Sequence, residues 1–179
     1  MENANKFLKD FASGISKGVN VAKLGKVVKF YPEVMKVDVM PLPSEDNAMI
    51  INVPVATVRT SDFLLYYPLK PDDNVILLFV DNDTDNILLG EDSIETERDH
   101  DVSDCICLGG ITLLKEKLDV DDTDAFIMQN IDNSSKIILK KDGKIEIEAP
   151  EIELKGMAIY RGREIAVKGD PTSDGASIV

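Results

Sequence analysis

Residues 136–156 read KIILKKDGKIEIEAPEIELKG, and this stretch decides the fold of the C-terminal part of the chain. Apolar and polar positions alternate within three short runs, whose apolar members are Ile137, Leu139, Ile145, Ile147, Ile152 and Leu154. A period of two is typical of a strand with one buried face. Asp142-Gly143 predicts a tight turn after the first run. Pro150 predicts a corner after the second, because proline donates no ladder hydrogen bond.

Together the three runs predict a narrow ribbon with one apolar stripe, and a ribbon of this width cannot bury its stripe alone. The rest of the chain offers no second stripe of matching period. We therefore expect the partner to be another copy of the ribbon, with three copies around an axis burying the stripe and exposing the Lys and Glu side chains. An antiparallel meander packed on the preceding domain is the alternative that the pattern leaves open.

The composition limits the possible functions. The chain has 179 residues, of which 44% are hydrophobic and 30% charged, so a folded domain with an appendage is expected. A formal net charge of −13 disfavours a nucleic-acid groove, which needs clustered Lys and Arg, and a helix attracted to anionic lipid. We expect neither a membrane span nor a secretory signal, because the chain lacks 18 consecutive apolar residues and a cationic start followed by an apolar core.

Cys105 and Cys107 are the only cysteines, and His100 is the only histidine. A zinc site would need two further ligands. If residues 104–110 form a strand, both thiols lie on one face, where an internal disulfide is poorly placed. We expect both cysteines to be small buried apolar residues.

Asp81, Asp83 and Asp85 have the spacing that begins a calcium loop. However, Asn86 stands where the sharp turn of that loop needs glycine, and Asp92 replaces the bidentate Glu. We expect a solvated hairpin loop at these residues, and no metal or cofactor anywhere in the chain.

Residues 5–17 predict a short amphipathic helix, since apolar side chains fall on one side at Phe7, Leu8, Phe11 and Ile15. Gly18 is a plausible end of this helix. A helix of this length is marginal alone, so we expect it to dock on the following domain or on a neighbouring subunit.

Short apolar runs with frequent turns make residues 24–89 an all-β region, predicted to be a small barrel or sandwich. We expect a hairpin over 27–39, in which Val28 and Phe30 share a face with Val37 and Val39. Further strands are expected at 49–53, closed by Pro54, at 63–67, at 75–80 and at 87–89. The run VILLFV at 75–80 predicts a fully buried strand, and 87–89 is expected to pair back with it.

The second half of the chain is more irregular. Residues 91–101 predict a charged connector, residues 113–125 an irregular stretch, and residues 126–128 the start of another strand. Arg98, His100 and Asp101 invite comparison with a catalytic triad, but no Ser stands in a nucleophile context and three residues of one loop do not converge by spacing alone. After 156 the alternation continues around residues 161–163.

Five motifs, taken in order, resemble the central spike proteins of contractile-tailed bacteriophages and related injection machines. They are VVKFYPEVMKVDVMPL at 27–42, INVPV at 51–55, YPLKPDDNVILLFVDNDTDNILLG at 67–90, ERDHDVSDCICLGG at 97–110 and SSKIILKKDGKIEIEAPEIELKG at 134–156. Each motif is loose, but their order is specific, and the resemblance covers about residues 20 to 156.

The resemblance implies an all-β chain, with an N-terminal OB-fold-like barrel followed by an intertwined trimeric β-helix or β-prism. The expected divisions are a helical segment at 1–20, the barrel at 21–112, a connector at 113–131 and the spike at 132–179. Expected partners are two further copies in a homotrimer, the tail-tube hub and other baseplate proteins, and transiently the host envelope. The protein would be made in the host bacterial cytoplasm and reside at the tail baseplate tip of the virion.

The chain departs from this family in two respects. Many relatives bind iron through a His-x-His pair near the tip, but no histidine follows His100 here. Some carry a lysozyme domain, for which this chain has no room. Two other hypotheses stay open: an OB-fold module that binds oligonucleotide or oligosaccharide, and a cell-wall hydrolase. The net charge and 6% aromatic content count against the first, and the absence of a paired-carboxylate cleft against the second.

Overall fold

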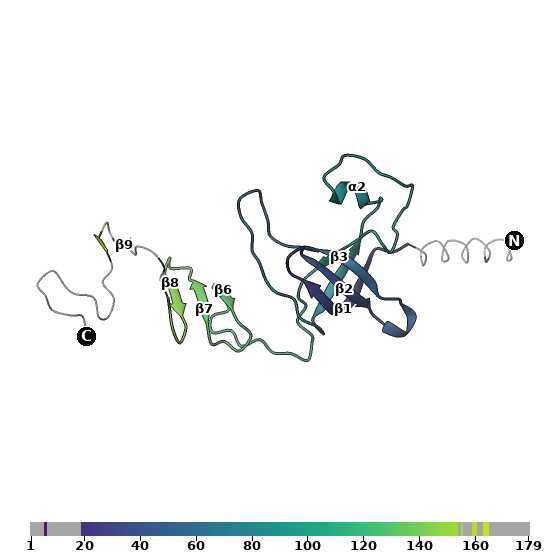
Figure 1. Ribbon diagram of the computed structural model, residues 1–179. Coiled ribbons are helices and arrows are strands. Elements are labelled where there is room, and N and C mark those ends of the chain that lie inside the picture. The colour runs from purple at the N-terminus through teal and green to yellow at the C-terminus, as the bar shows by residue number, and fades with distance from the viewer. Residues whose placement is uncertain (1–5, 7–18, 154, 156–158, 161–162, 165–179) are drawn as a thin grey trace, which may run out of the picture. The chain divides into compact units, whose positions relative to one another are not determined.

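The computed structural model describes residues 6, 19–153, 155, 159–160 and 163–164 (Figure 1). The chain divides into two compact units, Met1–Leu114 and Lys115–Val179. The predicted helix at 5–17 lies outside the described residues except for Lys6. None of the helices in the described ranges is long and apolar enough to span a membrane.

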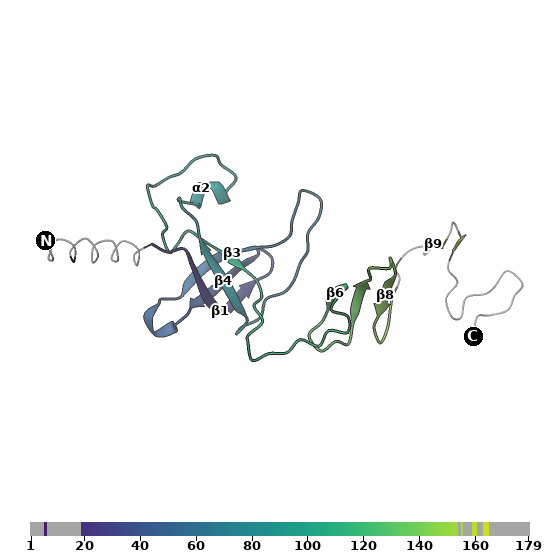
Figure 2. The ribbon, with the colours of Figure 1, turned by 180° about the vertical axis from the view of Figure 1, so that it is seen from behind.

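The first unit is a closed barrel of five strands (Figure 1). The strands are β1 (Ala22–Tyr31), β2 (Lys36–Pro41), β3 (Ile50–Ala56), β4 (Asn74–Phe79) and β5 (Cys105–Leu108). Their order around the barrel is β1-β2-β3-β5-β4, so β1 and β4 lie side by side and close it (Figure 2). The β3–β5 pair is parallel and the other pairs are antiparallel. The prediction of an all-β chain with an OB-like barrel is consistent with this architecture.

Alternation along each strand builds the barrel core. Inward positions of β2 and β4 are filled by Val37, Val39, Val75 and Leu77, none of which is exposed to solvent. Cys105 and Cys107 also belong to the core, which confirms the prediction that they are small buried residues. Their thiols are free, and burial raises their pKa values to about 11 and about 12, respectively.

The predicted hairpin over 27–39 forms, but Val28 does not face the core. The register of β1 on β2 shifts between Val27 and Lys29, as it does at a β-bulge. Val27 is therefore buried and pairs with Val39, whereas Val28 is 44% exposed. One inserted residue moves the following side chains to the other face, which strict alternation cannot anticipate.

The expectations for 49–53 and 75–80 need smaller corrections. Pro54 lies within β3 instead of closing it, at a position that pairs with Lys36 of β2, while the pairing with β5 begins only at Val55. The missing N–H of Pro54 therefore leaves no gap in the pairing of β3 with its neighbours. The run at 75–80 is buried on alternate positions only, because Leu78 is 40% exposed and Ile76 is half-buried.

Two predicted strands are absent from the described residues. Residues 63–67 form a loop with a single bridge, Arg59 to Leu64, and not a strand. Residues 87–89 do not pair back with β4, because Asp85–Leu88 form a helical turn, α2, in the excursion between β4 and β5 (Figure 1). A bond from the N–H of Leu88 to the carbonyl of Thr84, 2.9 Å long, closes this turn.

The second unit contains a three-stranded antiparallel sheet in the order β6-β7-β8. Its strands are β6 (Phe126–Gln129), β7 (Lys136–Leu139) and β8 (Ile145–Glu148). The predicted turn at Asp142-Gly143 is confirmed, with a φ of +85° at Gly143 that suits glycine, and so is the strand beginning at Phe126. Farther on, β9 (Ile159–Tyr160) and β10 (Arg163–Glu164) form an antiparallel pair.

The third apolar run of the predicted ribbon forms no strand in the part that the structure describes. Residues 151–153 after Pro150 carry no regular structure, and Leu154 lies outside the described residues. Proline fixes its own backbone and removes a donor, so pairing stops with β8. The residues that the structure describes do not form a β-helix.

Candidate functional site

The β6-β7-β8 sheet has one apolar face, which is the candidate functional site. In antiparallel pairing, residues directly opposite each other lie on the same side of the sheet. Ile137 of β7 stands opposite Met128 and Ile147, and Leu139 stands opposite Phe126 and Ile145. We call these six residues, two from each strand, the apolar face: Phe126, Met128, Ile137, Leu139, Ile145 and Ile147.

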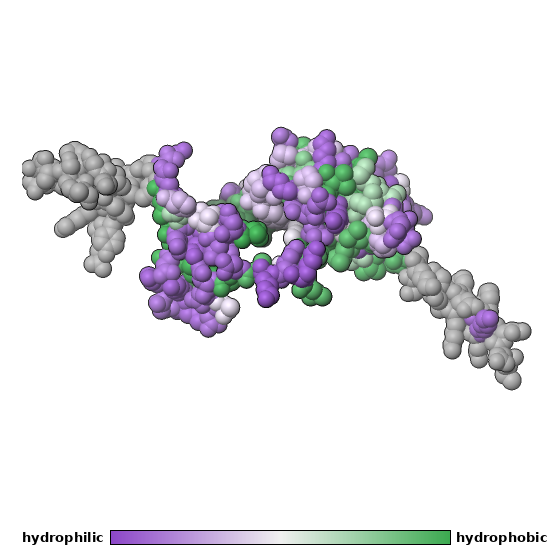
Figure 3. Space-filling view, turned by 90° about the horizontal axis from the view of Figure 1, so that it is seen from below, coloured by the Kyte–Doolittle hydropathy of each residue, from purple (hydrophilic) through white to green (hydrophobic). Residues whose placement is uncertain are grey.

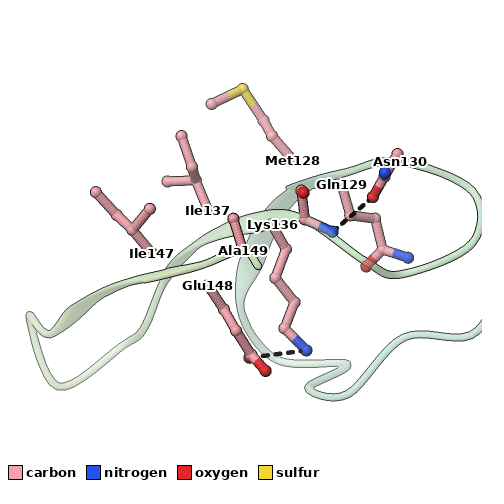
Figure 4. Close-up of a pocket in the computed structure, with 9 residues that line it drawn as sticks. Met128, Gln129, Asn130, Lys136, Ile137, Ile147, Glu148 and Ala149 are labelled. Atoms are coloured by element: carbon pink, nitrogen blue, oxygen red, sulfur yellow. Dashed lines mark hydrogen bonds and ion pairs between the residues drawn. The ribbon is translucent and has the colours of Figure 1, made fainter. Parts of the chain in front are cut away.

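The apolar face is open to solvent in the single chain. Phe126, Ile145 and Ile147 are 65%, 64% and 56% exposed, and Met128 and Leu139 are each more than 40% exposed. Figure 4 shows Met128, Ile137 and Ile147 projecting to the same side of the three strands. A hollow of about 410 Å³ borders these side chains and extends to Ala149. This surface can bury apolar groups of a partner.

The opposite face of the sheet is charged. Lys136 lies 3.1 Å from Glu148 and also pairs with Asp121, while Lys140 lies 2.8 Å from Glu146. Figure 4 shows Lys136 and Glu148 on the side away from Ile147. Hydrogen bonds from Lys140 and Lys144 lower the pKa of Glu146 to about 2, so this carboxylate stays ionised at neutral pH.

The segment before β6 packs on this charged side. Besides the Lys136–Asp121 pair, the side-chain amide of Gln129 donates to the carbonyl oxygen of Asp119 at 2.7 Å. Ile138 of β7 stands opposite Glu146 on this charged side of the sheet, and it is only 4% exposed. The two faces therefore differ in kind: the charged face is partly covered by the chain's own connector, and the apolar face is not covered by any residue that the structure describes.

Four of the six residues in the predicted stripe come together on the apolar face: Ile137, Leu139, Ile145 and Ile147. Ile152 is 51% exposed but lies outside the sheet. The sequence analysis missed Phe126 and Met128 as members of the face. Phe126 and Met128 alternate with Ile127 and Gln129, and this period of two could have identified them from the sequence. Whether the stripe lies at a trimer axis stays a prediction.

A second cluster, in the excursion between β4 and β5, holds the acidic residues of the supposed calcium loop. The guanidinium of Arg98 lies 2.8 Å from Asp83, 2.9 Å from Asp85 and 2.9 Å from Asp104. Asp83 and Asp104 are each 1% exposed, so the expectation of a solvated loop is wrong for Asp83. We call these four residues the Arg98 cluster.

Hydrogen bonds keep both buried carboxylates ionised. The N–H of Asp85 and the hydroxyl of Thr96 lower the pKa of Asp83 despite its burial. Burial opposes ionisation of Asp104, but hydrogen bonds from Arg98 and Thr84 outweigh it and hold its pKa below the ordinary value.

The carboxylate oxygens of Asp83, Asp85 and Asp104 are close enough together to hold a cation. Arg98 already supplies the positive charge at that place, with a pKa raised by its bonds to Asp104 and Asp85. The cluster therefore fits a structural role, tying the excursion to β5, better than a metal site.

The residues of the triad-like motif separate in space. Arg98 turns to the carboxylates, the imidazole of His100 lies 3.5 Å from Asp81, and Asp101 accepts a 2.9 Å bond from the N–H of Ser103. The structure thus brings no nucleophile, base and orienting acid together at Arg98, His100 and Asp101.

The outer surface of β2 and β3 is where an OB-fold would bind oligonucleotide. Asp38 of β2 is only 8% exposed and accepts bonds from the hydroxyl of Tyr31 and the N–H of Asn52, both 2.9 Å long. Lys29 lies 4.4 Å from the centre of the Tyr31 ring. The Tyr31 side chain is thus engaged within the chain, which is unfavourable for stacking on a nucleic-acid base.

Comparison with protein-family models and with curated protein sequences finds no match to this chain. The functional argument therefore rests on the residues and their geometry.

Proposed function

We propose that this chain is the structural central spike of a contractile phage tail or a related injection machine, and that it assembles as a homotrimer through the apolar face of the β6-β7-β8 sheet. The observation that carries the proposal is the two-sided character of that sheet, with six apolar side chains on one face and paired Lys and Glu on the other. The order of motifs along the chain supports the family.

Burial of the apolar face supplies the driving force for this assembly. Full burial of one Ile, Leu, Phe or Met side chain contributes about 1.5–3 kcal/mol, and these side chains are about half exposed, so each contributes roughly half of that. Burial of these side chains in three chains opposes the loss of translational and rotational freedom on association. The charged faces would point to water and keep the shaft soluble.

A mechanical role follows from this arrangement. Three sheets packed around a dry apolar centre resist bending, because any opening exposes side chains from all three chains at once. The barrels would form the wider base that caps the tube and contacts the tail hub. Contact with the host envelope would be transient, during penetration, and no step needs a catalytic residue or a cofactor.

The mass of the full-length protein in solution tests this proposal. Light scattering coupled to chromatography is expected to give three times the mass of one chain, and electron microscopy a particle with threefold symmetry. A monomer over the whole concentration range would contradict the spike proposal.

A second measurement tests the absence of catalysis. We expect no clearing band from the purified protein in a peptidoglycan zymogram. A band that follows the pure protein would favour the hydrolase hypothesis instead.

A further inference from the structure

The segment that precedes β6 is acidic and packs on the charged face of the sheet. Residues 119–124 read DVDDTD, and we call them the acidic strap. The strap carries four carboxylates, whereas residues 136–144, which form β7 and the following turn, contain four lysines. Figure 3 shows that hydrophilic residues dominate the visible side of the second unit. The strap and the strand thus have opposite charges, which favour contact between them.

The contacts of the strap follow β7 from one end to the other. Just before β7, the side-chain amide of Asn133 donates a 3.3 Å bond to the carboxylate of the first strap residue. Asp121 pairs with Lys136, the first residue of β7. Asp124 lies 2.8 Å from Lys141, which follows the strand. The strap therefore runs in the same direction as β7 and passes the middle of that strand.

Two apolar residues of the charged face lie on this path. Ile127 of β6 stands opposite Ile138 in the middle of β7. Ile138 is only 4% exposed, whereas Ile147, on the apolar face of the same sheet, is 56% exposed. Because a single sheet carries both side chains, the shielding of Ile138 needs a second layer. The acidic strap is the segment whose contacts lie on both sides of Ile138 along β7.

Lys136 is the main attachment of the strap. Its side chain is only 9% exposed, and it contacts both Asp121 of the strap and Glu148 of β8. The hydrogen bond from Lys136 lowers the pKa of Asp121, so this pair stays ionised at neutral pH. Both side chains of the Lys141–Asp124 pair are more than 70% exposed, and such pairs contribute little. The strap thus depends chiefly on one shielded ion pair.

We propose that the acidic strap is a detachable cover, held by the Lys136–Asp121 pair, that closes the charged face over Ile138 and so directs self-association to the apolar face. A sheet that is open on both faces can stack on other copies through either face, and such stacking does not close into a particle of fixed size. The attached strap leaves one open face. The cover is a property of a single chain, whereas its directing role rests on the self-association proposed above.

The reactivity of a thiol at position 138 tests the cover. Ile138→Cys in the full-length protein should react slowly with a maleimide. Adding Asp121→Lys, which sets two cations against each other, should speed the reaction about ten-fold or more, because the strap then opens. The matched control adds Asp62→Lys, the same charge change at an exposed residue of the β3–β4 loop, and should leave the rate unchanged. Cys105 and Cys107 are buried with raised pKa values, so they contribute little to the signal.

A second variant separates opening of the strap from an electrostatic effect on the thiol. Lys136→Glu breaks the same ion pair from the other side, and its negative charge disfavours the reactive thiolate. Acceleration by both Asp121→Lys and Lys136→Glu, with β7 amides still protected from hydrogen exchange, would support the cover. Equal labelling rates with and without Asp121→Lys would overturn it. Acceleration together with loss of β7 protection would also overturn it, because the strap would then be part of the sheet's own fold.

Light scattering tests the directing role. With Ile138 intact, Asp121→Lys should give species of larger mass than wild type at the same protein concentration, and Asp62→Lys should not. Unchanged mass in a variant whose strap is open would overturn the directing role and leave the proposed trimer unaffected. A wild-type mass of one chain would contradict the spike proposal instead, and the thiol result would still decide whether the strap is a detachable cover.

Discussion

The barrel and the β6-β7-β8 sheet use the same apolar residue types in opposite ways. The barrel closes on itself, so Val37, Val75 and Leu77 are fully buried within one chain. The sheet has three four-residue strands, and its apolar face is exposed. Closure therefore makes the barrel a self-sufficient core, whereas the apolar face of the sheet is left uncovered by the residues that the structure describes. Four changes test this difference, in order of decreasing expected effect.

Ile147→Asp should abolish assembly completely while the barrel stays folded. Ile147 lies mid-face opposite Ile137, and in a threefold arrangement one substitution brings three carboxylates together in an apolar centre. Chromatography with light scattering should report a monomer, and circular dichroism should report an intact barrel.

The control for that change is Glu148→Ala on the charged face, which should alter the free energy of unfolding by only about 0.5 kcal/mol. If Ile147→Asp stays trimeric with an unchanged melting temperature, Ile147 does not lie at the centre of the assembly.

Leu77→Ala should destabilise the barrel by about 2–5 kcal/mol without changing assembly through the sheet. Leu77 is fully buried in the barrel core, so the substitution leaves a cavity. Urea denaturation followed by barrel signals measures the change. Val34→Ala, at a residue 62% exposed in the β1–β2 turn, is the matched control and should cost far less. Equal losses for the two variants would place Leu77 outside the core.

Acid should weaken the barrel through the Arg98 cluster. The folded-state pKa values of Asp83 and Asp104 lie below the ordinary 3.8. Their ionised forms therefore stabilise the fold above about pH 3.8, and this contribution is lost as the pH falls through the folded values.

Arg98→Met tests this assignment, because it leaves the two carboxylates without their cation. The variant should have a lower melting temperature than wild type at pH 7. This difference in melting temperature should become smaller below pH 3. Thermal melts of both proteins from pH 2.5 to 7 measure this difference. A gap that is the same at every pH would show that Arg98 acts through packing and not through charge.

Lys141→Ala should have the smallest effect, within about 0.5 kcal/mol. The Lys141–Asp124 pair is 2.8 Å long, but both side chains are more than 70% exposed. Thermal melts of wild type and variant at low and high salt measure this change in stability. A loss of assembly on this substitution would mean that the Lys141–Asp124 pair lies in the interface.

The sequence predicts the parts of this molecule that depend on local pattern. Alternation from Ile137 to Ile147, with the Asp142-Gly143 turn, is sufficient to place four side chains on one face. Alternation in the first unit predicts the hairpin and the buried cysteines. Each of these features depends on residues close together in the chain.

Features that depend on distant residues were not predictable in the same way. The bulge beside Val28 is a property of the pairing with β2 and leaves no mark in the alternation of β1. The Arg98 cluster joins residues up to 21 positions apart and turns a charged stretch into a buried network. The helical turn α2 is a local feature by contrast, closed by bonds that Asp83 and Thr84 accept, and the strand-like residue types Ile87 and Leu88 concealed it.

The strand order has a further consequence for how the protein can join to itself. Every strand of the barrel has two neighbours, so the barrel offers no complete free edge for strand addition. In the β6-β7-β8 sheet, β6 and β8 each have one neighbouring strand among the described residues. Such a sheet can extend by adding strands from other copies, and extension stops only if the copies close into a ring. The rotation between neighbouring sheets thus decides between a particle of fixed size and an open fibre.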